Sequence, residues 1–202
     1  MTADAPRWNQ LIAASLERLW REFAPPDSLL PQLAFDAVLV RADDGEFLEC
    51  LPRLLELVTL PGADPELAVA VFDRLESHEW TSWPDERRRP VEELLDRWWA
   101  THLALEPGDP PAHDVLAALV RLDQPANRWL QPWLEDLDGP GARHLALLVR
   151  DQLSSTRWSE VPDRRGQVLA WTRSEPVVMG LTLVGGVHLD PGQLGDALDR
   201  ML

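Results

Sequence analysis

The spacing of the apolar residues constrains the fold more than any other feature of this chain. Along most of its length they recur every three or four positions, which places them on one face of an α-helix. The first such stripe comprises Trp8, Leu11, Ile12, Leu16, Leu19, Trp20 and Phe23. The pattern therefore predicts a chain built mainly of amphipathic helices.

Turn and cap residues divide this pattern into separate helices. Asp64 followed by Pro65 is typical of a helix start, because the aspartate caps the first turn and proline at the first helical position loses no hydrogen bond. Asp44-Gly45 begins another helix, and the acidic residues from Asp43 to Glu46 are interpreted as its cap. Further boundaries are predicted at Pro25-Pro26, Leu60-Pro61-Gly62, Glu106 to Pro110, Asp123 to Pro125, Gly139-Pro140-Gly141 and Asp190-Pro191.

These boundaries predict an all-α chain of about nine or ten helices in antiparallel pairs, forming a single domain over residues 1–202. The segment 168–189 fits a strand, because of Val177 and Val178, or a glycine-containing helix. Helix pairs of roughly forty residues resemble HEAT-like helical repeats, in which each pair buries its apolar face against its neighbours. The resemblance implies an α-solenoid, and an irregular helical bundle is the alternative.

The chain is strongly acidic, with 34 acidic and 19 basic residues and a formal net charge of −15. The excess is spread along the chain and forms no acidic tail. Such a charge repels phosphate backbones, so we expect no nucleic-acid partner, whereas a basic protein would be attracted. Every basic residue is arginine, and lysine and tyrosine are absent, which indicates a high-GC and therefore bacterial genome.

No stretch of the sequence is typical of a membrane span or a secretion signal. The best apolar run, from Pro176 to Leu189, is shorter than the ~20 residues that a spanning helix needs. Charged residues such as Asp4 and Arg7 interrupt the apolar pattern near the start of the chain, unlike the core of a signal peptide. We therefore expect a cytoplasmic protein without membrane contact.

Catalytic and metal-binding motifs are missing from the sequence. Cys50 is the single cysteine, which excludes an intramolecular disulfide, and its apolar surroundings predict a small buried side chain. No two of the five histidines have the four-residue spacing that puts two metal ligands on one helix face, and His102 and His144 are expected to pack against apolar neighbours. Neither a nucleophile elbow nor a phosphate-binding loop is present. The sequence therefore predicts no cofactor and no metal, and it favours a non-enzymatic protein over an enzyme.

The stretch from Glu79 to His102 holds the candidate binding residues. Three consecutive arginines follow two tryptophans, and such a cluster can clamp an acidic or aromatic group through stacking and paired hydrogen bonds. In the structural alternative, the tryptophans fill a connection between helices and the arginines pair with nearby carboxylates. The candidates for partner binding are Trp80, Trp83, Arg87, Arg88, Arg89 and Trp99.

The helix after these arginines has a predicted core face and a predicted start. Its apolar stripe comprises Val91, Leu94, Leu95, Trp98 and His102. Trp99 lies about 100° round the helix from Trp98, so it is expected to face a neighbouring helix or the surface. Pro90 would interrupt a helix already well under way, so we expect the helix to begin within a turn of Pro90.

Three functions are compatible with these features. The favoured one is a non-enzymatic protein–protein interaction module or adaptor of a bacterial cytoplasm. The second is an acidic inhibitor or immunity-type protein that neutralises a basic partner through fast, salt-sensitive association. The third is a small-ligand binder or enzyme with a carboxylate–histidine pocket between helices. The sequence leaves the oligomeric state open.

Overall fold

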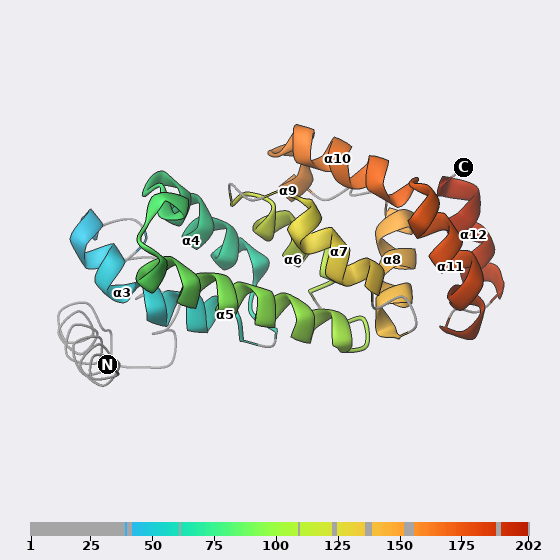
Figure 1. The fold of residues 1–202 in the computed structure, drawn as a ribbon, viewed down its shortest axis with the longest axis horizontal. Helices are drawn as coiled ribbons and strands as arrows, with labels where there is room; N and C mark the ends of the chain where they lie inside the picture. Colours follow the sequence, from blue (N-terminus) through green and yellow to red (C-terminus); the bar gives the residue numbers. More distant parts are fainter. Residues whose placement is uncertain are drawn as a thin grey trace. The chain divides into compact units, whose positions relative to one another are not determined.

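The structure of the chain, a computed structural model, describes residues 39, 42–60, 62–108, 110–122, 125–135, 139–151, 156–188 and 191–201. Over these residues the chain forms α-helices and one short 3₁₀ helix, and it contains no strand (Figure 1). The predicted all-α class is therefore confirmed. The two helices predicted before Asp43, including the Trp8 to Phe23 stripe, lie outside the described residues except for Leu39.

The described ranges contain ten α-helices, whereas the predicted nine or ten were counted over the whole chain, including the two before Asp43. The ten helices are α3 (Asp44–Val58), α4 (Pro65–Ser77), α5 (Asp85–Ala104), α6 (Ala112–Leu119), α7 (Asn127–Glu135), α8 (Pro140–Asp151), α9 (Thr156–Ser159), α10 (Pro162–Thr172), α11 (Glu175–His188) and α12 (Pro191–Met201). The 3₁₀ helix η1 (Trp80–Ser82) connects α4 to α5. Among these described helices, none has the length and the apolar character that crossing a bilayer requires.

The chain divides into two compact units, Met1–Ala63 and Asp64–Leu202. Within the first unit the structure describes α3 and its flanking residues, and α4 to α12 belong to the second unit. Two compact units can belong to one domain or to two. The single domain over residues 1–202 therefore stays a prediction.

A capping box starts α3. Asp43 Oδ1 accepts a hydrogen bond from the backbone N–H of Glu46 at 2.9 Å, and Glu46 Oε2 accepts one from the backbone N–H of Asp43 at 3.1 Å. The predicted cap is thus confirmed, and it satisfies two N–H groups that have no partner inside the helix. Cys50 is buried, as predicted. Burial, followed by the charges of Glu49 and Glu46, raises the pKa of its thiol.

The start of α4 also agrees with the prediction. Pro65 is its first residue, and Asp64 Oδ1 accepts a hydrogen bond from the backbone N–H of Glu66 at 2.9 Å. The aspartate therefore caps the helix at the position where proline costs no hydrogen bond.

The segment 168–189, which was compatible with a strand or a helix, holds the end of α10 and the whole of α11, with a turn at Arg173 and Ser174 between them. α11 begins where the carbonyl of Ser174 accepts hydrogen bonds from the backbone N–H groups of Val177 and Val178, both at 3.1 Å. Val177 and Leu181 are fully buried. Met179, midway between them, is 52% exposed, so burial recurs every four residues, as on a helix face, and not every two, as on a strand.

Tryptophan fills the core of the second unit. There α4 packs on α6, α5 packs on α6, α7 and α8, and α8 packs on α11 and α12. The largest fully buried side chains are five tryptophans: Trp80, Trp99, Trp129, Trp133 and Trp158. Each buries a large apolar ring, but its indole N–H then needs an acceptor.

Three of these tryptophans hydrogen-bond to the backbone of a neighbouring helix, and two of them link α5, α7 and α8. Trp99 of α5 donates its indole N–H to the carbonyl of Trp129 in α7 at 2.7 Å. Trp133 of α7 donates to the carbonyl of Gly141 in α8 at 2.9 Å. Because an unpaired buried N–H is costly, these bonds fix the ring orientations and the separations of α5, α7 and α8.

The short helix α9 is held in the same way. It has four residues, too few to be stable as an isolated helix. Trp158 is fully buried and donates its indole N–H to the carbonyl of His113 in α6 at 3.2 Å. Tertiary packing, and not local helix propensity, therefore keeps α9 in place.

The buried face of α5 differs from the predicted one. Its buried residues are Val91, Leu95, Trp99 and Leu103. Leu94, Trp98 and His102 are only half-buried, at the edge of this face. Val91 and Leu95 are thus buried as predicted, and Trp99 faces a neighbouring helix, but the rest of the predicted stripe is wrong by one position. Trp99 lies at the centre of the buried face because the acceptor for its indole N–H, a carbonyl of α7, is on that side of α5.

α5 also begins earlier than predicted. Its first residue is Asp85, with Pro84 as the N-cap, so Pro90 lies inside the helix and not within a turn of its start. Proline at this position removes a backbone hydrogen bond to the carbonyl of Glu86. The side chain of Arg88 offsets part of that loss, because it pairs with carboxylates on both sides of it along the helix.

Replacing Trp99 by phenylalanine should destabilise the protein more than the same substitution at Trp129. Both rings are fully buried, but the indole N–H of Trp129 has no hydrogen-bond partner among the described residues. Trp99→Phe leaves the Trp129 carbonyl without its donor, and we expect an additional loss of about 1–3 kcal/mol in unfolding free energy. Urea denaturation followed by circular dichroism measures the difference. Equal losses of unfolding free energy in the two variants would show that the hydrogen bond from Trp99 to the Trp129 carbonyl adds nothing to the effect of the smaller ring.

Candidate functional site

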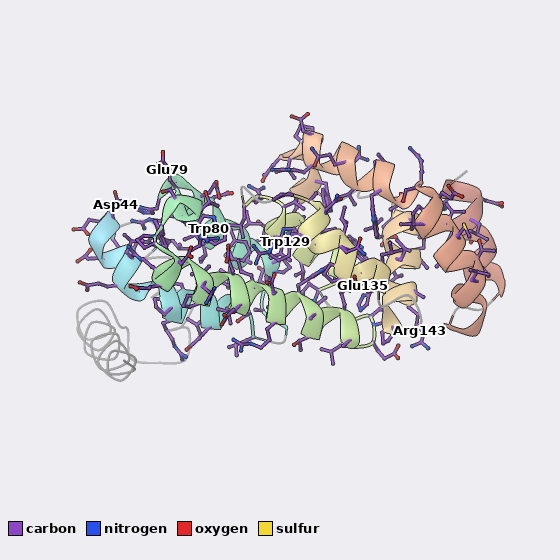
Figure 2. The ribbon with its side chains drawn as sticks, viewed as in Figure 1. Asp44, Glu79, Trp80, Trp129, Glu135 and Arg143 are labelled. Atoms are coloured by element: carbon purple, nitrogen blue, oxygen red, sulfur yellow. The ribbon has the colours of Figure 1, made fainter. Side chains whose placement is uncertain are left out.

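The turn between α4 and α5 fixes Trp80 in the core. Glu79 has a left-handed backbone with φ of 48°, which reverses the chain direction after α4. Trp80 then lies fully buried, and its indole N–H donates to Glu76 Oε2 at 3.1 Å. Figure 2 shows Glu79 projecting from this turn, with Trp80 beneath it. Trp80 is therefore a core residue and offers no surface to a partner.

Trp83 and Arg87 form a stacked pair at the surface. The indole N–H of Trp83 donates to the carbonyl of His78 at 3.1 Å, which fixes the ring. The guanidinium carbon of Arg87 lies 4.0 Å from the centroid of that ring. Trp83 is half-buried and Arg87 is exposed. The pair therefore presents a preoriented cation on an aromatic platform.

The other two arginines of the cluster have different surroundings. Arg88 is bound on both sides, by Asp85 Oδ1 and by Glu92 Oε1, each at 2.5 Å. Its hydrogen bond and charge lower the pKa of Asp85. Arg89 is exposed and lies about 200° round α5 from Arg87, so the helix does not place it beside Trp83.

The structure therefore separates the six candidate residues. It brings Trp83 and Arg87 together at the surface, and it places Trp80 and Trp99 in the core. Arg88 is neutralised by its own helix, as the structural alternative predicted for these arginines. We refer below to Trp83 with Arg87 as the Trp83–Arg87 pair.

A half-buried ion network around Arg157 was not apparent from the sequence. Its guanidinium donates to Asp114 Oδ2 of α6 at 2.7 Å. Arg157 Nε also lies 2.9 Å from Glu66 Oε1 of α4, and Nη2 lies 3.7 Å from Asp64 Oδ1. One arginine of α9 thus balances three carboxylates from two other helices, and these residues share no motif in the sequence.

His113 lies next to this network and, among the described residues, comes close to the expected carboxylate–histidine arrangement. Its Nε2 is 4.0 Å from Asp114 Oδ1 and 3.9 Å from Asp151 Oδ2, beyond hydrogen-bonding distance. Burial lowers its pKa, and the two carboxylates oppose that shift. Arg157 pairs with Asp114, and Arg150 pairs with Asp151. Each carboxylate beside His113 is thus also paired with an arginine, and the cluster links α6, α8 and α9.

A second histidine cluster joins α5 and α8. The ring centroids of His102 and His144 are 5.8 Å apart. His144 is buried, as predicted, and its Nε2 donates to the carbonyl of Leu105 at 2.9 Å. Burial, and then the charge of His144, lowers the pKa of His102 to about 4, and a hydrogen bond to the Pro110 backbone acts in the opposite direction. The ring of His102 is therefore neutral at pH 7.

Within the described ranges, no group of three or more histidine, cysteine, aspartate or glutamate side chains is arranged to hold a metal ion. The Trp83–Arg87 pair is therefore the arrangement with the clearest binding chemistry on the described surface.

Replacing Arg157 by methionine should lower the unfolding free energy by about 1–3 kcal/mol. The substitution leaves three carboxylates without their shared cation, but two of them are more than half exposed and keep part of their hydration. Arg143→Met is the matched control, because Arg143 pairs with the exposed carboxylate of Glu106 and should contribute about 0.2–1 kcal/mol. Thermal and urea denaturation measure both. A loss at Arg157 no larger than at Arg143 would contradict the structural role of the network.

The unfolding free energy should also fall as the pH is lowered from about 6.5 to 4. Over this interval the unfolded chain takes up a proton at His102 and the folded chain does not, so stability that is present above pH 6.5 is lost. His102→Phe cannot take up this proton, and its stability should depend less steeply on pH. Urea denaturation from pH 4 to 7 gives the pH dependence of the unfolding free energy for both proteins. From it follows the number of protons taken up on unfolding, which should be larger for the wild type by nearly one. Parallel pH curves would contradict the lowered pKa.

No protein-family model matches this sequence, and no match was found among curated proteins or among solved structures. The function has to be argued from the side chains described above.

Proposed function

We propose that this chain is a non-enzymatic protein-interaction module or adaptor that binds its partner through the Trp83–Arg87 pair. The observation that carries the proposal is an exposed guanidinium held 4.0 Å above a tryptophan ring. Arginine and tryptophan are among the residues that contribute most to binding energy at protein interfaces. Because the two side chains are already oriented, little conformational freedom is lost when a partner binds.

The chemistry of the pair favours a carboxylate or an aromatic group on the partner. Arg87 has no ion-pair partner among the described residues, in contrast to Arg88. Its guanidinium can bind a carboxylate through two hydrogen bonds, and the Trp83 ring offers an apolar surface beside it. The partner therefore needs a local acidic or aromatic group at this position, whatever its overall charge.

We include a HEAT-like α-solenoid in the proposal, with an irregular helical bundle as the alternative. Contacts between helices close along the chain, such as α4 and α6, fit a solenoid in which each helix pair packs on its neighbours. Contacts across four places, such as α8 with α12, fit a bundle equally well.

Charge reversal at Arg87 tests the proposal. Tagged wild-type protein and the Arg87→Glu variant are incubated with lysate of the natural host, and retained proteins are identified by mass spectrometry. We expect a stoichiometric partner to be retained by the wild type and lost with Arg87→Glu, because the new carboxylate repels the partner's acidic or aromatic group. Circular dichroism shows whether the variant is folded.

Arg89→Glu is the matched control, since it makes the same charge change at an exposed position on a different side of the same helix. We expect this variant to retain the partner. Retention by Arg87→Glu at the wild-type level would exclude the Trp83–Arg87 pair. Equal loss with both variants would mean that the charge of α5 matters and the stacked pair does not.

The net charge of −15 favours one further candidate, an acidic inhibitor or immunity-type protein with a basic partner. Its association would weaken steeply with salt. This function would be supported if both arginine variants retain the partner at low salt and lose it at high salt. The adaptor would be supported if the wild type and Arg89→Glu retain the partner at both salt concentrations and Arg87→Glu does not.

A further inference from the structure

One face of α11 is apolar and exposed. Pro176, Met179 and Leu183 follow one another at spacings of three and four, so they lie on the same side of the helix, which we call the α11 face. Met179 is 52% exposed and Leu183 is 74% exposed. Val177 and Leu181 point to another side and are fully buried, where α11 packs on α8 and α12. The helix therefore buries one apolar side and leaves a second one open to solvent.

The same helix belongs to the least charged part of the chain. The run from Pro176 to Leu189 contains no aspartate, glutamate or arginine, and no other uncharged run in the sequence is as long. Glu175, the first residue of α11, is the only carboxylate of this helix. The rest of the chain carries a net charge of −15. An apolar face on an uncharged helix is thus an exception on a strongly acidic molecule.

We propose that the α11 face binds a second copy of this chain, with the two α11 helices packed antiparallel about a two-fold axis. In such a contact the same patch serves both copies, so an apolar face meets its own equivalent.

The charge of the chain selects this occupant. Two copies with a net charge of −15 repel each other wherever their carboxylates meet, so they can associate only through a surface without charge. The α11 face is such a surface. A basic partner would be attracted to the carboxylates of the molecule and would gain nothing from an uncharged face. The complement of this face is another neutral, apolar surface, and the α11 face of a second copy provides one.

The antiparallel arrangement keeps the remaining charges of the two helices apart. The 14 residues of α11 span about 21 Å, with Glu175 at one end. In an antiparallel pair the two Glu175 side chains lie at opposite ends of the contact, whereas a parallel pair would place them side by side. The helix dipoles also oppose each other in this arrangement. Met179 and Leu183, in the middle of the helix, then lie next to the axis.

The size of the face sets the strength of the dimer. Three side chains cover only part of the ~800 Å² that each partner buries in a standard interface. We therefore expect a dimer that exchanges rapidly with the monomer and becomes more populated as the concentration rises. Salt should strengthen it, because salt screens the repulsion between the two acidic copies and leaves the apolar contact. Association through ion pairs would weaken with salt.

Sedimentation velocity of the full chain over a range of concentrations, at low and at high salt, tests the proposal. We expect the wild type to dimerise, and more so at high salt. Leu183→Glu should weaken dimerisation by roughly 100-fold or more, because the two-fold axis brings in two like charges at the contact. Leu183 is mostly exposed, so the variant should fold normally, and circular dichroism checks this.

Leu105→Glu is the matched control, since it makes the same change at an exposed leucine outside α11 and should dimerise nearly as the wild type does. Carbon-13 NMR of the methionine methyl groups provides a measurement on the wild type alone. The Met179 signal, assigned with Met179→Leu, should shift as the concentration rises. The proposal would be overturned by a wild type that stays monomeric, by a dimer that salt weakens, by equal effects of the two glutamate variants, or by a Met179 signal that does not change with concentration.

Discussion

The second unit depends on a simple constraint: an indole N–H that is taken out of water costs free energy unless it finds an acceptor. Trp99 and Trp133 meet it by donating to backbone carbonyls of the next packed helix. Their rings also contact each other edge to face, with centroids 5.5 Å apart. Because a backbone carbonyl cannot move without its helix, each bond sets the position of a whole element. The stacking of α5, α7 and α8 follows from these bonds, and so do the surfaces that the helices leave exposed.

Arginine supplies the second interhelix link, in a chain where carboxylates are in excess. Arg157 is shared among carboxylates of α4 and α6, and Arg121 pairs with Asp73 of α4 and with Glu160 after α9. In α7, Arg128 makes two hydrogen bonds to Asp96 of α5. These arginines between helices are thus already paired with carboxylates of the same chain. Arg87 is different, because it lies at the exposed start of α5 and its contact is an aromatic ring.

Local signals were reliable where the interacting groups are close in sequence. The cap of α3 and the start of α4 could be predicted because the acceptor and donor are two or three residues apart. The buried face of α5 could not be predicted in the same way. Trp98 and Trp99 are equally apolar, and the choice between them rests on an acceptor in α7, thirty residues away. Of the candidate site, the sequence predicted the neighbourhood of Trp83 and Arg87 but could not separate this pair from Trp80, whose indole is turned inward by the backbone at Glu79.

The sequence by itself determined that the chain is helical and where several helices begin, because apolar period, caps and proline act over one or two turns. It also determined the acidic charge of the molecule. Only the tertiary structure decided which tryptophans are buried, which arginines are neutralised and which histidines face each other. His102 and His144 illustrate the reason: neither ring carries a local signal of the other, and the packing of α5 on α8 is what brings them together.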